Sequence, residues 1–282
     1  MASRKRNPPR AGETSHDDVG FWSEIKLDIL AKYWPAYTRI VKKRFYTLYI
    51  DAFAGSGMHV SRTTGDFIRG SPARALDVKP PFDEYHFVDL DAAKVTSLEE
   101  LAAARANVTV HHGDCNSILL DELFPHVRYD YFRRAICLLD PYSLQLDWSI
   151  IERASAMTTI EIFLNFPILD INRNVLRKNP SDRKTEQMTR FWGDESWRDA
   201  AVKKEKMLFD LTDDVKVENW ELVEAFRERL RKVAEFTFVP EPMAMRNRQR
   251  AAVYYLFFAG NNETGATIVT DIFNGYRDKG YG

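Results

Sequence analysis

Four aspartates each close a strand-like run of the sequence, and they are the side chains best suited to hold a polar ligand. They are Asp51 after YTLYI, Asp89 after EYHFV, Asp114 after NVTVHHG and Asp140 after AICLL. Carboxylates at the ends of parallel strands can accept hydrogen bonds from a ligand's amino and hydroxyl groups. A lone acid at such a junction is more often the N-cap of the next helix. Three acids at successive strand ends, one beside a glycine-rich turn, favour a ligand.

The turn after the first run, DAFAGSG, predicts a close approach between backbone and ligand. Ala54, Gly55 and Gly57 are small, and glycine also adopts backbone angles that other residues avoid. The turn is shorter than the dinucleotide fingerprint GxGxxG, and Val60 stands where the third glycine would be. Asp51 would repel a pyrophosphate and attract a positive amino group. These features favour S-adenosylmethionine, which has an amino group and a sulfonium but no phosphate.

The next two acids fit the same ligand. Asp89 can accept hydrogen bonds from both ribose hydroxyls, the role of the equivalent acid in nicotinamide sites, whereas Asp91 is better placed as a helix N-cap. Asp114 can accept from the adenine amino group, while the backbone amide of Cys115 donates to the ring. The sequence therefore predicts a cofactor site made of Asp51, Ala54, Gly55, Gly57, Asp89, Asp114 and Cys115.

The fourth acid lies in LLDPY, and this motif predicts the reaction centre. It resembles the (D/N)PP(Y/F) motif of amino-methyltransferases but lacks the second proline. An exocyclic amine needs acceptors for its hydrogens and a surface that holds it in line. Asp140 and the carbonyl of Pro141 can be the acceptors, and Tyr142 can stack on a base. A proline turn after a strand is common, so the motif is informative mainly because of its place in the series.

Residues near this motif are predicted to line the substrate pocket. Asn165 and Phe166 end the fifth run, LNFP, and Ser143 follows the DPY tripeptide. A base within a duplex would have to be flipped out to reach such a pocket. Lys26, in the helical segment before the first run, could reach over the cofactor or a nucleic-acid phosphate, but the prediction is that it lies on a solvated face.

The order of these runs predicts the fold that positions the site. Strand-like runs alternate with helical segments up to about residue 167, which is typical of βαβ units in a parallel sheet. The predicted fold class is α/β, a Rossmann-like methyltransferase sheet with an α-helical insertion before the last strands. The insertion covers about 168–235, and two further strand-like runs and an amphipathic segment follow it. Pro35 is expected to kink or break the first helix.

Composition narrows the class of protein. The 282 residues are 45% hydrophobic and 29% charged, which is typical of a soluble globular domain. Residues 1–17 are predicted to be a disordered polar tail, and 18–282 a single domain. The two cysteines form no cluster, which argues against a structural metal and fits a cytoplasmic protein. No apolar run is long enough to span a bilayer.

A net charge of −1 gives the chain no overall attraction for nucleic acid, so any such contact depends on local patches. The most basic short segments are KKR at 42–44 and RNRQR at 246–250. Charge runs are usually solvated, and these two are candidates for nucleic-acid contact only because they adjoin predicted strands.

Taken together, the motifs resemble those of the three-Cys-motif partner family. YIDAFAGSG, GSPARAL, FVDLD, GDCN, LLDPYSLQLDW, IFLNFP and YYLFFAG follow in the family's order, from about residue 17 onward. The resemblance implies a methyltransferase-like fold, an S-adenosylmethionine site at the residues above, and a neighbouring cysteine-motif protein as a partner. Ser143 stands where the family tends to have glycine, and Ser56 where it tends to have proline. Ser143 can narrow the substrate side, and Ser56 leaves the cofactor turn intact.

The predicted function is methyl transfer from S-adenosylmethionine to an amino group of a nucleobase, in RNA or DNA. One alternative is a non-catalytic, cofactor-binding partner or adaptor of the cysteine-motif protein. The other is an α/β enzyme that holds magnesium at its strand-end acids, which would leave the glycine-rich turn without a role.

Overall fold

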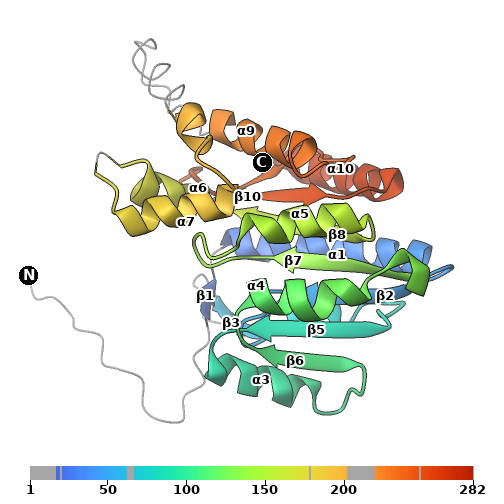
Figure 1. Ribbon diagram of the computed structural model, residues 1–282. Coiled ribbons are helices and arrows are strands. Elements are labelled where there is room, and N and C mark those ends of the chain that lie inside the picture. Colours follow the sequence, from blue (N-terminus) through green and yellow to red (C-terminus); the bar gives the residue numbers. More distant parts are fainter. Residues whose placement is uncertain are drawn as a thin grey trace, which may run out of the picture.

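A seven-stranded sheet is the centre of the computed structural model, which describes residues 17–19, 21–61, 67–177, 179–201, 220–247 and 249–281. The strand order is β6-β5-β2-β7-β8-β10-β9 (Figure 1). The bounds are β2 (Tyr46–Asp51), β5 (Glu84–Asp89), β6 (Val108–His112), β7 (Arg133–Leu139), β8 (Ile160–Phe166), β9 (Met243–Arg246) and β10 (Ala252–Ala259). The predicted α/β sheet is confirmed.

The pairing directions place the ends of the first strands at one edge. β6, β5, β2, β7 and β8 are parallel, whereas β10 is antiparallel to both β8 and β9. The chain order reverses between β2 and β7, and such a reversal opens a crevice at the carboxyl ends of the strands. Residues 135–139 of β7 have no exposed surface, as expected for a strand covered on both faces.

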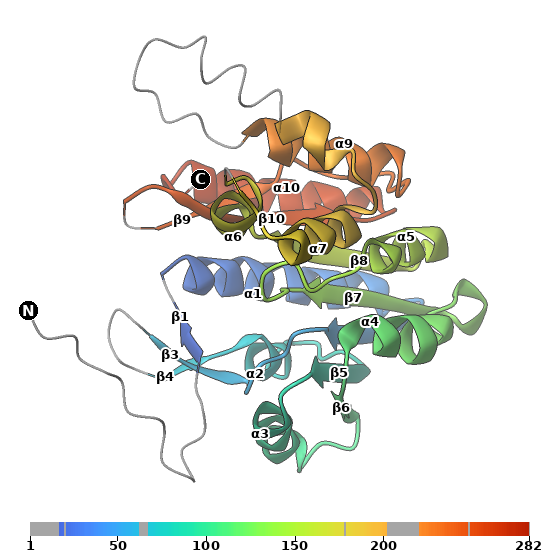
Figure 2. The ribbon, with the colours of Figure 1, turned by 60° about the vertical axis from the view of Figure 1, so that its left-hand side comes forward.

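Helices cover both faces of the sheet (Figures 1 and 2). One hydrophobic cluster joins the sheet to α1 (Phe21–Val41), α2 (Ser71–Ala75), α3 (Ala92–Ala102) and α10 (Glu263–Arg277). The cluster on the other face includes α4 (Cys115–Ser117), η1 (Ile118–Leu123), η2 (Phe124–His126) and α5 (Trp148–Met157). The short turn η3 (Tyr129–Tyr131) leads into β7.

The first helix does not break at Pro35. α1 continues across this residue as one helix of 21 residues. A proline inside a helix costs about 3 kcal/mol or more. The residues around Pro35 offset that cost by burial, because Tyr33, Trp34 and Tyr37 are at most 3% exposed in the core beneath the helix.

A second, small sheet was not predicted from the sequence. It has the order β1-β3-β4 and consists of β1 (Asp17–Val19), β3 (Met58–Ser61) and β4 (Phe67–Arg69) (Figure 2). Asp17, the last residue of the predicted tail, pairs with His59 in this sheet. The rest of the predicted tail, 1–16, lies outside the described residues. Strands of three or four residues show too little alternation to be recognised in a sequence.

The described elements between 168 and 235 are helical, as predicted. They include α6 (Ile168–Asp170), η4 (Ile171–Val175), α7 (Asp182–Trp192) and α9 (Trp220–Lys232), while 202–219 lie outside the described residues. Phe226 of α9 stacks on Phe191 of α7, with ring centroids 5.5 Å apart, and lies 4.7 Å from Phe166 of β8. Trp192 and Trp197 are buried core residues, whereas Trp220 is 37% exposed.

Because Phe226 is fully buried between the insertion and the sheet, Phe226→Ala should lower the free energy of unfolding by about 3–5 kcal/mol. Val233→Ala is the control, since Val233 follows α9 and is 47% exposed, and it should change stability by less than about 0.5 kcal/mol. Urea denaturation measures both. A loss below about 1 kcal/mol for Phe226→Ala would show that the insertion does not share the core of the sheet.

Candidate functional site

A cleft of about 950 Å³ lies at the carboxyl edge of the sheet, between the strand ends and α7. The arrowheads of β5 and β7 in Figure 1 point toward this edge. Four predicted site residues line it: Asp89, Asp114, Cys115 and Tyr142. Its volume is within the usual range for a site that holds a small ligand. The parallel strands thus bring together side chains that are far apart in the sequence.

The glycine-rich turn has the backbone geometry that its composition predicts. Gly55 and Gly57 have φ angles of 66° and 74°, in the left-handed region. A Cβ atom on Gly57 would lie 2.8 Å from Leu101 of α3, so only glycine fits there without a shift. The amide of Ala54 donates to the carbonyl of Val88 at 2.9 Å, which ties the turn to β5.

Asp89 holds the turn in place from the neighbouring strand. One carboxylate oxygen accepts from the amide of Gly55 at 2.8 Å, and the other accepts from the amide of Asp91 at 2.9 Å. Each oxygen keeps a second lone pair, and the side chain lines the cleft. Asp89 can therefore position the turn and still accept from hydroxyl groups of a ligand. Leu90, which is 68% exposed beside it, is a further lining residue that the sequence did not reveal.

Two of the acids act as helix caps. Asp91 accepts from the amides of Ala93 and Lys94 at the start of α3, as predicted. Asp114 accepts from the amide of Asn116 at 3.1 Å, so this residue is a cap as well as a lining residue of the cleft. Burial raises the pKa of Cys115 to about 12, so its thiol stays protonated. This suits a role for the Cys115 backbone rather than for its sulfur.

Asp51 is a fully buried carboxyl group behind the glycine turn. One oxygen accepts from the Tyr49 hydroxyl at 3.0 Å, and the other accepts from no described residue. Burial raises the pKa of Asp51 to about 6, the neighbouring hydroxyls of Ser71 and Tyr49 lower it, and the charge of Asp140 raises it. A buried acceptor without a partner is costly. Asp51 does not line the cleft, so a ligand donor reaches this oxygen only if the turn in front of it moves.

Asp140 lies at the centre of a partly buried polar cluster. The ammonium of Lys26 pairs with one carboxylate oxygen, and the side-chain amide of Asn165 donates to the other. Lys26 was expected on a solvated face, but its side chain is only 7% exposed, so that prediction is wrong. Tyr254 of β10 completes the cluster, with its ring centroid 5.7 Å from the lysine nitrogen.

The residues after Asp140 connect the strand end to the insertion. Pro141 is buried, and Tyr142 is 54% exposed, with the ammonium of Lys94 at 4.8 Å from its ring centroid. Ser143 has a φ of 60°, a conformation that explains why glycine suits this position. Its hydroxyl donates to Asp170 of α6.

The insertion reaches this loop from two helices. Asp170 of α6 accepts from Ser143, and the ammonium of Lys184 in α7 donates to the same hydroxyl at 3.1 Å. Gln187 and Arg190 of α7 line the cleft, and the guanidinium of Arg190 is 3.4 Å from the carboxylate of Asp147. No local motif marks these α7 residues, so only the tertiary structure identifies them.

The predicted substrate residues Asn165 and Phe166 do not lie together in the structure. Asn165 lies beneath Asp140 at 4% exposure, and its own carbonyl oxygen is buried without a described donor. Phe166 has no exposed surface, and its ring packs against Phe191 and Phe226. The expectation that Phe166 lines the pocket is therefore not met. Side chains alternate along a strand, so Asn165 and Phe166 point to opposite faces of β8.

Among the described residues, no group of three or more His, Cys, Asp or Glu side chains is arranged to hold an ion. Lys26 and Asn165 already engage both oxygens of Asp140. These contacts give no support to the magnesium alternative.

In the part of the chain that is described, no helix combines the length and apolar character needed to cross a bilayer.

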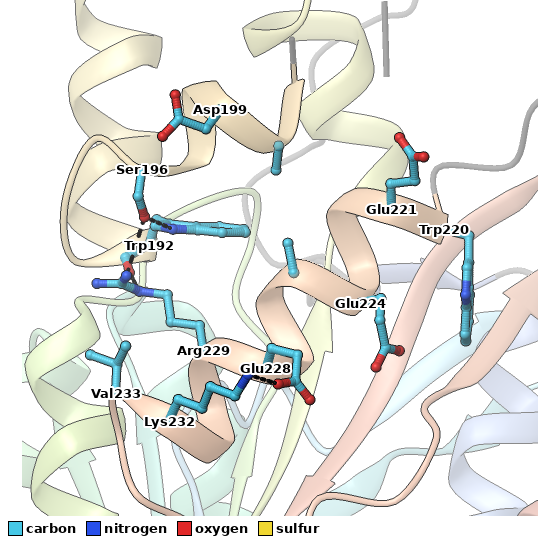
Figure 3. Close-up of a pocket in the computed structure, with 12 residues that line it drawn as sticks. Trp192, Ser196, Asp199, Trp220, Glu221, Glu224, Glu228, Arg229, Lys232 and Val233 are labelled. Atoms are coloured by element: carbon cyan, nitrogen blue, oxygen red, sulfur yellow. Dashed lines mark hydrogen bonds and ion pairs between the residues drawn. The ribbon is translucent and has the colours of Figure 1, made fainter. Parts of the chain in front are cut away.

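A hollow of about 580 Å³ lies elsewhere, between α9 and the segment after α7 (Figure 3). Trp192 and Arg229 contribute to its walls, and Glu228 on its rim pairs with Lys232 at 2.7 Å. None of the predicted site residues lines this hollow. We therefore assign the ligand site to the cleft at the strand ends.

Known structures agree with the fold. No protein-family model and no curated protein matches the chain. Protein LPL1258 from Legionella pneumophila str. Philadelphia 1, of the family DUF519, is similar over 93% of this chain and 94% of its own, with 13% identity and a TM-score of 0.54. That similarity concerns the fold alone. With the observed strand order, it supports the predicted Rossmann-like α/β sheet.

Two other solved structures match more loosely. Trm5b from Pyrococcus abyssi has 13% identity over 79% of this chain and 46% of its own, with a TM-score of 0.36. Fibrillarin from Aeropyrum pernix, solved with bound S-adenosyl-L-methionine, has 12% identity over 84% and 76%, with a TM-score of 0.38.

The buried Asp51 carboxyl predicts a pH-dependent gain in stability for Asp51→Asn. Between about pH 4 and pH 6 the folded protein holds a proton that the unfolded chain has released, so stability falls as pH rises through this window. Asparagine carries no charge at either pH. The gain in free energy of unfolding of Asp51→Asn over the wild type should therefore grow from pH 5 to pH 8, toward an order of 3 kcal/mol. Thermal denaturation at both pH values measures this difference. An equal effect at pH 5 and pH 8 would contradict the raised pKa.

Proposed function

We propose that this chain is an S-adenosylmethionine-dependent methyltransferase that acts on an amino group of a nucleobase. The observation that carries the proposal is the arrangement at the end of β7. There a carboxylate oriented by Lys26 and Asn165 is followed by a buried proline and an exposed tyrosine beside the cleft. The fold supports this assignment but does not identify the substrate.

The residues around the cleft fit the cofactor. Asp51 is assigned to the amino group, which requires the turn with Ala54, Gly55 and Gly57 to open toward its unpaired oxygen. Asp89 has lone pairs for the ribose hydroxyls. Asp114 and the amide of Cys115 can meet the adenine edge. When bound, S-adenosylmethionine would supply an electrophilic methyl group.

The protein's own contribution is to position an amine. Asp140 can accept one amine hydrogen and the carbonyl of Pro141 another, which turns the nitrogen lone pair in one direction. Tyr142 can stack on the base, because more than half of its surface is exposed. Lys26 and Asn165 are positioning residues that restrict the Asp140 carboxylate to one orientation.

The substrate side is bounded by Ser143 and the insertion. The hydrogen bonds of Ser143 with Asp170 and Lys184 narrow the approach to Tyr142. A splayed or flipped base of RNA or DNA is planar and fits such an approach better than a flexible amine.

We further propose that the chain belongs to the three-Cys-motif partner family and acts in the cytoplasm with a cysteine-motif protein. The motif order in the sequence supports this.

One observation favours the adaptor alternative. Both oxygens of Asp140 already have donors within the chain, so this carboxylate could serve only to join α1 to β7 and β8. In that case the cleft would bind the cofactor without turnover. Asp140 variants distinguish the two functions, because an adaptor does not need an acceptor at the reaction centre.

Calorimetric titration with S-adenosylmethionine tests the cofactor site. We expect micromolar binding by the wild type and a loss of at least about tenfold for Asp89→Ala, because the ribose acceptor and the anchor of Gly55 are both removed. Asp121→Ala is the control, since Asp121 is exposed in η1 outside the cleft. Absence of binding by a folded wild-type protein would rule out an independent methyltransferase.

Transfer of a labelled methyl group to RNA and DNA pools tests the reaction centre. Asp140→Ala should reduce turnover by about 10²–10³-fold, while cofactor affinity stays within a few fold, because Asp140 is assigned to the amine. Lys26→Met should reduce kcat less, by about tenfold, since it removes a partner that orients Asp140 but leaves the carboxylate itself in place. If the wild type binds S-adenosylmethionine but transfers a methyl group to neither pool, the adaptor function is favoured.

A further inference from the structure

Exposed aromatic rings and arginines alternate at the edge of the sheet opposite the cleft. Tyr46 begins β2, and Tyr129, Tyr131 and Phe132 precede β7, with exposures of 41%, 58%, 56% and 64%. Large aromatic side chains are seldom left this exposed unless they have a partner. We call this region the Arg–aromatic surface and define it by Phe45, Tyr46, Arg128, Tyr129, Tyr131, Phe132, Arg133 and Arg134.

Guanidinium groups lie over most of these rings. Arg133 lies 4.9 Å from the ring centroid of Tyr46, and Arg128 lies 5.3 Å from that of Tyr131. Arg134 lies 4.8 Å from the centroid of Phe45 and 5.8 Å from that of Tyr129. These contacts hold cations and flat rings side by side without burying either.

The backbone holds Phe132 outward at a cost. Its φ is 52°, a left-handed conformation that is unfavourable for a bulky residue. The amide of Phe132 donates to the carbonyl of Tyr129 at 2.8 Å, and its own carbonyl accepts from the amide of Tyr46 at 2.7 Å. An exposed phenyl ring in this conformation contributes little to folding. Its presence therefore suggests a partner outside the chain.

The local charge is positive although the whole chain is nearly neutral. Arg128 pairs with Asp130, Arg133 with Glu84, and Lys42 with Asp83. By contrast, Lys43, Arg44 and Arg134 form no ion pair with any carboxylate among the described residues. Lys43 and Arg44, which directly precede Phe45, are exposed and available to an anionic partner. Arg134 donates to the carbonyl of Thr158 at 3.1 Å and keeps further N–H donors for such a partner.

A hollow of about 820 Å³ adjoins the surface and has Tyr129 and Arg134 in its wall. Glu152, Glu235 and Asn261 also line it. The two carboxylates disfavour a phosphate there, whereas the mixture of donors and acceptors suits a base or a ribose. Rings for bases, cations for phosphates and a polar hollow for a sugar or base edge are the parts of a single-strand binding site.

We propose that the Arg–aromatic surface binds single-stranded nucleic acid. Unstacked bases pack on Tyr129, Tyr131 and Phe132, and the phosphates lie near Lys43, Arg44 and Arg134. Base pairs in a duplex expose no free ring faces, so the surface selects single strands. The length of β7, seven residues or about 20 Å, separates it from the cleft. Binding at this edge goes beyond methyl transfer and does not require it.

Fluorescence anisotropy with labelled 12-mers of oligouridine and oligothymidine, without cofactor, tests the proposal. The wild-type protein should bind at least one single strand at least tenfold more tightly than a 12-base-pair duplex. Phe132→Asn and Tyr129→Ala should each weaken that binding by about tenfold, since stacking on one ring is worth roughly that factor. Asparagine tolerates the left-handed conformation, so Phe132→Asn should leave thermal stability unchanged or raise it. Trp220→Ala removes an exposed ring from α9 and is the matched control.

Two further measurements locate the contact. Arg134→Gln should reduce the slope of log K against log salt by about 0.7, the value for one single-strand phosphate contact. Photocrosslinking with 4-thiouridine should label the peptide that contains residues 128–134. The preferred 12-mer, ribose or deoxyribose, shows whether the surface accepts RNA, DNA or both.

Several outcomes would overturn the proposal. If the wild type binds neither 12-mer at 50 mM salt, the Arg–aromatic surface does not bind single-stranded nucleic acid. If binding survives both Phe132→Asn and Tyr129→Ala but is lost with Tyr142→Ala, the strand contacts only the cleft. Failure of methyl transfer would leave these results unchanged, because no measurement here involves turnover.

Discussion

The ion pair between Lys26 and Asp140 is the interaction on which the arrangement of the site depends. An ammonium that is only 7% exposed requires a carboxylate partner, because an unpaired charge at that depth would be strongly destabilising. The pair joins α1 to the end of β7, and Asn165 extends it to β8. The first helix, two central strands and the DPY loop are thus fixed relative to one another by one polar cluster. A hydrophobic contact would not orient them so narrowly, since apolar burial is not directional.

The same region contains groups that lower the stability of the folded protein. Asp51 keeps a buried oxygen without a donor, and the nearby charge of Asp140 adds to the rise of its pKa. Ser143 adopts a left-handed backbone conformation that its side chain does not favour. The core on both faces of the sheet compensates for these costs, because nearly every residue of β7 and β8 is buried. Concentrated strain and unpaired groups at the carboxyl edge are typical of a binding site rather than of a structural junction.

Sequence patterns predicted the parts of this site that are local in the chain. The acid at each strand end, the small residues of the turn and the DPY loop all lie next to strong strand signals, so parallel pairing alone places them at one edge. Lys26 was not recognised because its partner is 114 residues away and nothing nearby distinguishes it from a surface lysine. Phe166 was misplaced because alternation along β8 sends neighbouring side chains to opposite faces. Gln187 and Arg190 reach the cleft only because α7 packs across the strand ends.

The two edges of the sheet differ in what they offer a partner, and the difference follows from the direction of the strands. At the carboxyl edge, acids and tight turns create an acceptor-rich cleft. At the amino edge, the strands begin with Tyr46 and Arg133, and the preceding turn leaves Phe132 exposed, so rings and cations remain at the surface. An acid-lined cleft repels phosphates, so a polyanionic substrate needs attraction from another part of the protein. A chain with a net charge of −1 can supply that attraction only locally, and the Arg–aromatic surface has both the charge and the ring faces to do so.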